Sequence, residues 1–156
     1  MAKKAPDDKT VCRNRKASYR FEILEQFECG LCLFGTEVKS LRDKHASLDE
    51  AYARLSDGEV WLVNFHIGPY RFGTSAQHEA VRKRKLLLHA REIRKLKVKT
   101  EQKGFTLVPL RVFFNDRGIA KVTLALCQGK TLGDKRQALK TREHTREMER
   151  SARRRT

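Results

Sequence analysis

The chain of 156 residues has a formal net charge of +16 at pH 7 and is 39% hydrophobic, enough apolar sequence for one domain with a single core. Such a charge attracts polyphosphates, anionic lipids or acidic proteins, but no apolar run approaches the roughly 20 residues of a membrane-spanning helix, and the basic segments lack an apolar face for the bilayer surface. The first eight residues contain no hydrophobic export signal, so we expect a cytoplasmic protein without a membrane partner.

Alternation of apolar and polar residues predicts six strands, at 18–26, 31–35, 48–55, 59–64, 106–114 and 119–127. Gly30 is expected to form a turn or bulge before the second strand. Ser56-Asp57-Gly58 and Asn115-Asp116-Arg117-Gly118 are hairpin turns, and Pro109 requires an edge or a bulge in its strand. Six strands in hairpin order favour a closed or partly closed antiparallel barrel, because closure removes unpaired strand edges.

Two helices are expected beside these strands. The apolar spacing changes from two to three over 36–42, which predicts a short helix with Thr36 as its N-cap. Residues 90–102 have helical composition, with Ile93 and Leu96 on one side and basic residues around the rest. A long loop is expected at 65–77, between the strand at 59–64 and the second helix. The expected fold is therefore mainly β with flanking helices.

The positive charge is concentrated in two segments. Residues 82–103 hold ten Lys and Arg against two Asp and Glu, and residues 129–156 hold ten against four with no Phe, Trp or Tyr. The second segment cannot offset the roughly 1 to 2 kcal/mol per residue of backbone entropy that ordering costs. We therefore divide the chain into a flexible start (1–10), a folded module (11–128) and a basic tail (129–156) that is disordered until it binds an anion.

The cysteines and the near-complete enzyme motifs do not indicate catalysis. Cys29-Gly30-Leu31-Cys32 could be a redox pair or half of a zinc site, but a second pair is missing and the motif lies at the start of a predicted strand. His78-Glu79-Ala80-Val81-Arg82 begins like the zinc-protease motif, yet Arg82 occupies the second ligand position. We expect no metal, no cofactor and no enzyme, with a thiol or zinc protein as the open alternative.

Folded RNA is the partner that the remaining pattern favours. Most aromatic residues alternate within predicted strands and are expected in the core: Tyr19, Phe21, Tyr52, Trp61 and Phe113. Few aromatics are then left to stack the bases of a single strand, whereas shape and phosphate contacts suffice for a duplex. A ribosomal or assembly protein that binds ribosomal RNA by general electrostatics remains an alternative.

Five separated blocks carry a more specific signal. They are Asn14-Arg15-Lys16-Ala17, Gly35-Thr36-Glu37-Val38-Lys39-Ser40-Leu41-Arg42, Arg84-Lys85-Leu86-Leu87-Leu88-His89, Gly104-Phe105-Thr106-Leu107-Val108-Pro109-Leu110, and Gly129-Lys130 followed by Asp134-Lys135-Arg136. Together they closely resemble the bacterial small protein B (SmpB) family, the binding proteins of transfer-messenger (SsrA) RNA. The resemblance runs from about Val11 to the end of the chain.

The resemblance implies a barrel related to the oligonucleotide-binding (OB) fold and a role in ribosome rescue, without catalytic activity. A protein of this kind works with elongation factor Tu to deliver alanyl-charged transfer-messenger RNA to ribosomes stalled without a usable codon. Translation then resumes on the reading frame of the RNA itself. We expect a monomer with these partners.

The resemblance also implies a set of RNA-binding residues: Asn14, Arg15, Lys16, Glu28, Gly35, Thr36, Glu37, Lys39, Ser40, Arg42, Arg84, Lys85, Leu87, His89 and Lys121. Glu28 can accept hydrogen bonds from guanine or cytosine, or fix a neighbouring Arg, with a cross-strand ion pair as the alternative. Lys121 offers a phosphate contact or is a solvated strand lysine. Leu87 packs beneath an RNA loop or in the core.

The tail is expected to bind the ribosome at the decoding centre and the mRNA channel of the small subunit. The residues implied are Lys130, Asp134, Lys135, Arg136, Arg142, Arg146 and Arg150. The last three recur every fourth residue, so a helix over about 134–150 would form on binding phosphate, with Asp134 as its N-cap. Family members usually carry an aromatic residue or His where this chain has Gly133, a possible hinge.

Overall fold

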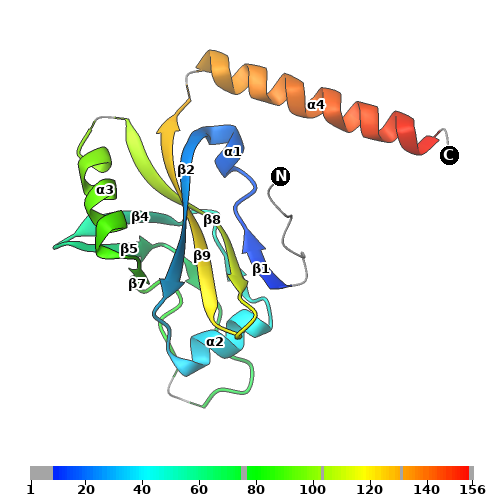
Figure 1. Cartoon of the computed structure of the whole chain (residues 1–156). Helices are drawn as coiled ribbons and strands as arrows, with labels where there is room; N and C mark the ends of the chain where they lie inside the picture. The colour runs from blue at the N-terminus through cyan, green and yellow to red at the C-terminus, as the bar shows by residue number, and fades with distance from the viewer. Residues whose placement is uncertain (1–8, 75–76, 103, 131, 155–156) are drawn as a thin grey trace.

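The computed structural model of the chain describes residues 9–74, 77–102, 104–130 and 132–154. They form a mixed fold in which a large antiparallel sheet carries short helices and one long helix extends away from it (Figure 1). Most of the predicted flexible start, 1–10, lies outside the described residues, although Thr10 already belongs to the first strand. Among the described helices, none is long and apolar enough to span a membrane.

Seven strands form the main sheet in the order β1-β8-β4-β5-β7-β2-β9. Their bounds are β1 Thr10–Arg13, β2 Phe21–Leu31, β4 Tyr52–Ser56, β5 Glu59–Val63, β7 Arg84–Leu87, β8 Phe105–Phe114 and β9 Ala120–Gly129. Because β8 also pairs with β9, six of these strands form a closed ring, with β1 added outside β8. Two short strands, β3 (Ala46–Ser47) and β6 (His66–Ile67), pair separately.

The ring encloses the main hydrophobic core because its strands alternate as the sequence predicts. In β9, Val122 and Leu124 are fully buried, whereas Lys121 and Thr123 between them face outward and are half-buried. Phe27 and Cys29 of β2 point into the same core. Burial of such side chains contributes about 1.5 to 3 kcal/mol each to the stability of the module.

The four helices of the described segments are α1 (Ala17–Arg20), α2 (Gly35–Arg42), α3 (Ala90–Thr100) and α4 (Leu132–Arg154). α2 begins where the Glu37 carboxylate accepts the backbone N–H of Phe34 at 2.7 Å, so Phe34 is the N-cap residue. Thr36 lies inside the helix, where its hydroxyl is 3.0 Å from Nδ1 of His78. The prediction of Thr36 as the cap was therefore wrong. The helix expected over 90–102 is confirmed as α3, which buries Leu96.

Two strand predictions also need correction. β2 runs without a turn through Gly30 to Leu31, and α2 begins at Gly35, so there is no separate strand at 31–35. The strand that pairs with the Gly30–Leu31 end of β2 is β7, which lies within the basic segment 82–103 and was not predicted. Gly30 allows a close approach of β7, since a Cβ atom on it would lie 3.1 Å from Cβ of Leu87 and would be tightly packed. Cys29 and Cys32 consequently lie at the end of a strand and not at its start.

The predictions of two hairpin turns and of a bulge at Pro109 are confirmed. Asp57 and Gly58 have positive φ angles of 52° and 74°, as a tight two-residue hairpin between β4 and β5 requires. Asn115 to Gly118 joins β8 to β9, and Gly118 also has a positive φ of 75°. The register of β8 against β9 shifts between Pro109 and Arg111, which is the expected bulge at the proline.

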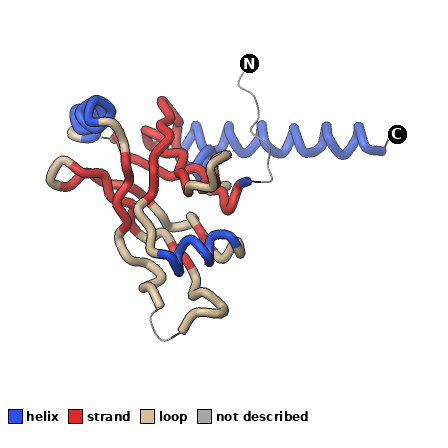
Figure 2. The backbone as a smooth tube through the Cα atoms, turned by 60° about the horizontal axis from the view of Figure 1, so that its bottom comes forward, coloured by secondary structure: helices blue, strands red, loops and turns tan. Residues whose placement is uncertain are grey.

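The basic tail is described as α4, which begins beyond the end of β9 and extends away from the sheet (Figures 1 and 2). It includes the segment 134–150, whose side chains are mostly exposed. That this segment is disordered until it binds stays a prediction. Asp134 lies in the first turn and does not precede the helix, so its predicted N-cap role was wrong; its charge still favours the helix N-terminus.

Candidate nucleic-acid interface

The sheet brings three of the predicted RNA-binding residues together around Gly30. Gly30 of β2 pairs with Leu87 of β7 on one side and with Lys121 of β9 on the other. Paired residues point to the same side of a sheet, and so do residues two apart on one strand. Glu28, opposite Thr123, therefore shares this surface. We call it the outer face and define it by Glu28, Gly30, Leu87, Lys121 and Thr123.

The outer face presents apolar, acidic and basic groups to solvent. Leu87 is 50% exposed, so it is not a core residue, and it covers Gly30. Glu28 is exposed and Lys121 is half-buried. Among the described residues neither of them has a hydrogen-bond or salt-bridge partner, so the cross-strand ion pair considered for Glu28 is not formed there. Both charges are available to a ligand.

β8 extends the outer face with two residues that the sequence did not indicate. Arg111 lies opposite Thr123 and Phe113 lies opposite Lys121. Strict alternation from the buried Leu107 would place both inside. The bulge at Pro109 reverses the alternation, so Val112 is buried and Phe113, expected in the core, is half-buried on the outer face. The sequence predicts the bulge, but not that the bulge reverses which of the following side chains point into the core.

α2 lies beside the turn between β8 and β9 (Figure 1). The Arg42 guanidinium lies 5.2 Å from the centroid of the Phe114 ring, and Nζ of Lys39 lies 5.3 Å from that of Tyr70. Both basic side chains are exposed. Cation–π contacts of this kind orient a charge without neutralising it, so these residues remain available to phosphate.

Three predicted contact residues, Glu37, Ser40 and Arg84, are instead enclosed by protein, with 0% of each exposed. The Glu37 carboxylate accepts hydrogen bonds from Nε of Arg82 at 2.7 Å, Nη2 of Arg82 at 2.6 Å and Nε of Arg84 at 2.8 Å. Arg84 also donates to the carbonyl oxygen of Phe65 at 2.5 Å. A side chain without exposed atoms offers nothing to an RNA, and this network instead fastens α2 to the 65–84 segment.

The electrostatics of the network keep Glu37 ionised. Burial alone would raise the pKa of Glu37, but hydrogen bonds from Arg82 and Phe34 and the charge of Arg84 outweigh it, so the pKa lies below its ordinary value of 4.5. Arg82 also lies over the ring of Phe34, 4.1 Å from its centroid. The carboxylate therefore holds two guanidinium groups and the start of α2 in one arrangement.

The other predicted residues lie at the edges of the surface. Arg15 and Lys16 are exposed after β1, in a turn where the Asn14 side chain accepts the N–H of Lys16 at 3.2 Å. Lys85 forms a 2.5 Å salt bridge with Glu59. His89 caps α3, and its N–H donates to Glu92 at 3.2 Å. Gly35 and Thr36 begin α2.

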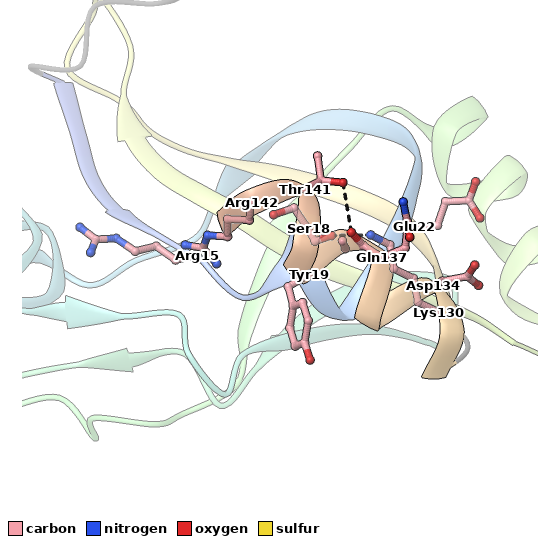
Figure 3. Close-up of a pocket in the computed structure, with 10 residues that line it drawn as sticks. Arg15, Ser18, Tyr19, Glu22, Lys130, Asp134, Gln137, Thr141 and Arg142 are labelled. Carbon is pink, nitrogen blue, oxygen red and sulfur yellow. Dashed lines mark hydrogen bonds between the residues drawn. The ribbon is translucent and has the colours of Figure 1, made fainter. Parts of the chain in front are cut away.

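A groove between α1 and α4 connects the module to the tail. It has a volume of about 780 Å³, and Figure 3 shows Arg15 and Arg142 toward one end with Lys130 and Asp134 toward the other. Nζ of Lys130 donates to the Ser18 carbonyl at 2.7 Å and anchors the chain just before α4. A neighbouring cavity also contains Arg15 and Arg142 and reaches Arg111 and Thr123. Basic residues thus run from the outer face to the tail.

The two cysteines of the Cys29-Gly30-Leu31-Cys32 motif are both free thiols. Cys29 is buried and Cys32 is exposed, so the two thiols face different environments. Burial raises the pKa of Cys29 to about 12, which disfavours the reactive thiolate. Within the described ranges, no three His, Cys, Asp or Glu side chains come close enough to hold a metal ion.

Comparisons with known proteins agree with this geometry. A sequence model of the family described as "SmpB protein" matches residues 11–154. An "SsrA-binding protein" from Desulforudis audaxviator is 53% identical over 146 residues, covering 94% of this chain and 95% of the relative. A Nostoc protein of the same name is 51% identical over 152 residues, covering 97% of each chain.

A solved structure described as "tmRNA-SmpB: a journey to the center of the bacterial ribosome" contains a chain of similar fold. It is 49% identical to this one and superposes with a TM-score of 0.66, covering 82% of this chain and 93% of that one. Fold and sequence therefore indicate the same relatives.

Proposed function

The chain belongs to the SmpB protein family, and we propose that it binds the tRNA-like domain of transfer-messenger RNA and delivers that RNA to stalled ribosomes for trans-translation. The relatives' name, "SsrA-binding protein", supports the choice of RNA. The observation that carries the proposal is the convergence of Glu28, Leu87 and Lys121 around Gly30, from three separate strands. The chain itself performs no reaction in this role.

The chemistry of the outer face suits a folded RNA. Lys121 supplies a phosphate contact, and the exposed Arg15, Lys39 and Arg42 add charge around it. Leu87 offers an apolar surface to a sugar or base, and Glu28 accepts from a base edge. Phosphate contacts position an RNA while base contacts specify it, so both kinds of group are needed. The six-stranded ring, acting as an OB-like barrel, is the rigid support for this surface.

We propose a separate role for the tail. Arg142, Arg146 and Arg150 form a stripe along α4, and Lys130, Asp134, Lys135 and Arg136 lie at its base. The helix extends away from the sheet, and its described side chains are absent from the main core. We assign it to the decoding centre and the empty mRNA channel of the small subunit. Elongation factor Tu completes the delivery complex. The protein acts in the cytoplasm as a monomer. Binding to phosphate orders the tail.

One observation favours the alternative of general ribosomal-RNA binding. The exposed side of α3 carries Arg91, Arg94, Lys97 and Lys99, which lie on a different element from the outer face. A protein that binds by charge alone would use this surface as readily as Lys121. The two functions therefore predict different results for lysines of the two surfaces.

Substituting Lys121 with Ala is expected to weaken binding of the tRNA-like RNA and to lower the slope of log K against log salt by about one, because each neutralised phosphate contributes roughly 0.7 to 0.9. Glu28→Ala is expected to weaken binding with the slope little changed, since a base contact releases no counterion. Binding titrations at several salt concentrations measure both values.

Lys99→Ala is the matched control, because it removes one exposed lysine from α3. We expect its affinity for the tRNA-like RNA to stay close to that of the unmodified protein. Equal losses for Lys99→Ala and Lys121→Ala would support general electrostatic binding. Tighter binding by Glu28→Ala would show that this carboxylate repels the RNA and does not take part in its recognition.

A further inference from the structure

The ring of six strands is barely closed between β4 and β8. The two strands pair at a single position, where Ala53 lies opposite Leu107. In an antiparallel pair of that register Leu55 would lie opposite Phe105, but these two described residues do not pair. β4 and β8 therefore separate beyond Ala53, toward the hairpin that joins β4 to β5. We call this gap the opening and define it by Leu55 and Phe105.

Backbone groups of both strands face the opening. A two-residue hairpin closes with a hydrogen-bonded pair, here Ser56 and Glu59, so alternation along β4 turns the N–H and C=O of Leu55 away from β5. On β8, the Gly104 carbonyl accepts the N–H of Gly129 at 3.4 Å, so the next residue, Phe105, directs its groups away from β9.

These backbone groups have no strand beside them. In the described part of the chain Leu55 pairs only with Val60, and Phe105 pairs only with Gln128, each on the opposite edge of its strand. No hydrogen bond from the described turns and loops reaches either backbone. The opening thus offers two N–H donors and two carbonyl acceptors.

A groove of about 700 Å³ occupies the opening. It lies between the hairpin, the start of β8 and the end of α3, which Figure 1 shows beside β4 and β5. Leu55, Phe105 and Leu107 give it an apolar lining. Tyr52, which was expected in the core, is instead 39% exposed and also lines the groove. A surface that combines apolar side chains with free backbone groups suits an extended polypeptide.

The charge around the groove favours an acidic partner. Arg54 is an exposed lining residue and forms no salt bridge with the described residues. Asp57 and Glu101 also line the groove, but α3 holds five basic residues against one acidic residue. A local excess of positive charge attracts a negatively charged segment and repels a basic one.

We propose that the opening binds an extended peptide segment of a partner protein, one that alternates apolar and polar residues and carries acidic residues at one end. The peptide adds a strand, because its backbone pairs with the free groups of Leu55 and Phe105. Its apolar side chains cover the apolar lining, and a carboxylate reaches Arg54. Sheet edges in proteins are usually blunted or covered, so an uncovered edge with apolar walls fits a transient partner.

The backbone groups favour a peptide over RNA as the occupant. Donors and acceptors that alternate along a strand match another extended backbone. Phosphate oxygens only accept hydrogen bonds, so a phosphate would leave the carbonyl groups of Leu55 and Phe105 without donors. The groove shares no described residue with the outer face, and this inference goes beyond RNA binding.

Amide hydrogen exchange of the free full chain, followed residue by residue, tests whether the opening exists. The N–H groups of Leu55 and Phe105 should exchange faster than those of Arg54 and Thr106, which face β5 and β9. Equal protection of all four would show that β4 and β8 are paired there and would overturn the proposal.

The binding probe is an eight-residue peptide of alternating Val and Thr that ends in two Asp, with both termini blocked and a fluorophore attached. We expect saturable binding to the full chain by fluorescence anisotropy, with slower exchange of the Leu55 and Phe105 amides in the complex. Methylation of one central peptide nitrogen removes a donor without changing the protein, and it should weaken binding by roughly tenfold.

Two charge reversals locate the bound peptide. Arg54→Glu should weaken binding of the probe by roughly tenfold, the effect of losing one charged partner. Arg117→Glu changes the net charge equally, at an exposed turn residue that does not line the groove, and should bind the probe like the unmodified chain. Thermal unfolding of both variants checks that the module is folded.

Three results would overturn the proposal. They are the absence of saturable binding, equal losses in the two charge reversals, and binding that leaves the Leu55 and Phe105 amides unprotected. Protection of these amides by the tRNA-like RNA in place of the peptide would assign the opening to RNA and would overturn it as well.

Discussion

Replacing Lys135 and Arg136 together with Ala is expected to abolish the tagging of stalled proteins while leaving the affinity for transfer-messenger RNA nearly unchanged. Both residues lie in the first turns of α4, beyond Lys130, and not among the residues of the outer face. Their charges would meet ribosomal phosphate only when the tail enters the channel, and charge-assisted contacts to phosphate are the strong ones. A reconstituted tagging reaction and an RNA-binding titration on the same preparation give the two readings.

The control is the pair Lys97→Ala and Lys99→Ala on α3, which removes the same charge from an exposed helix of the module. Tagging should survive in this control. Persistent tagging in the tail variant, or parallel loss of RNA binding and tagging, would contradict the division between a recognising module and a ribosome-sensing tail.

Glu37→Gln is expected to destabilise the module by about 3 to 5 kcal/mol, the cost of removing one partner from a buried ion pair. The amide would leave the buried guanidinium of Arg84 without a counter-charge and would weaken the hold on Arg82. Because the network fastens α2, binding through Lys39 and Arg42 should weaken as well. Urea unfolding gives the change in stability.

Glu59→Gln is the matched control, since it removes a carboxylate from the solvent-exposed salt bridge with Lys85. Water and salt screen such a pair, so its urea midpoint should stay nearly unchanged. A similar loss of stability in both variants would show that burial of the Glu37 network has no special importance.

The same carboxylate predicts an acid-dependent stability. The pKa of Glu37 is lower in the folded protein than its ordinary value of 4.5, so its ionised form stabilises the fold above that pH. This contribution is lost as pH falls below 4.5 through the folded pKa. In Glu37→Gln this part of the acid dependence should be missing from the free energy of unfolding measured against pH.

Local patterns predicted the parts of the fold that local chemistry determines. The hairpin at Asp57 and Gly58, the bulge at Pro109 and the helix from Ala90 all follow from short-range preferences. β7 was missed because its Arg84 is buried by a carboxylate 47 positions away, which no local pattern reveals. A charged residue in a basic segment is predicted to be solvated, because a distant buried partner is not evident from the local sequence.

The candidate site shows the same limit. The family resemblance indicated Glu28, Leu87 and Lys121, but only the pairing of β7, β2 and β9 shows that they meet around Gly30. Glu37 and Arg84 came from the same resemblance and turned out to support the surface from inside. To place Arg111 and Phe113 on the outer face, the change of alternation after Pro109 has to be followed along the rest of β8.

Binding of the tRNA-like RNA by the chain truncated after Gly129 tests the central claim most directly. The outer face and α2 remain complete in this variant, and the described side chains of α4 are absent from the hydrophobic clusters. We predict an affinity within about tenfold of the full chain, the difference reflecting the lost basic residues. Binding reduced to the level of an unrelated duplex would place recognition in the tail and contradict the account.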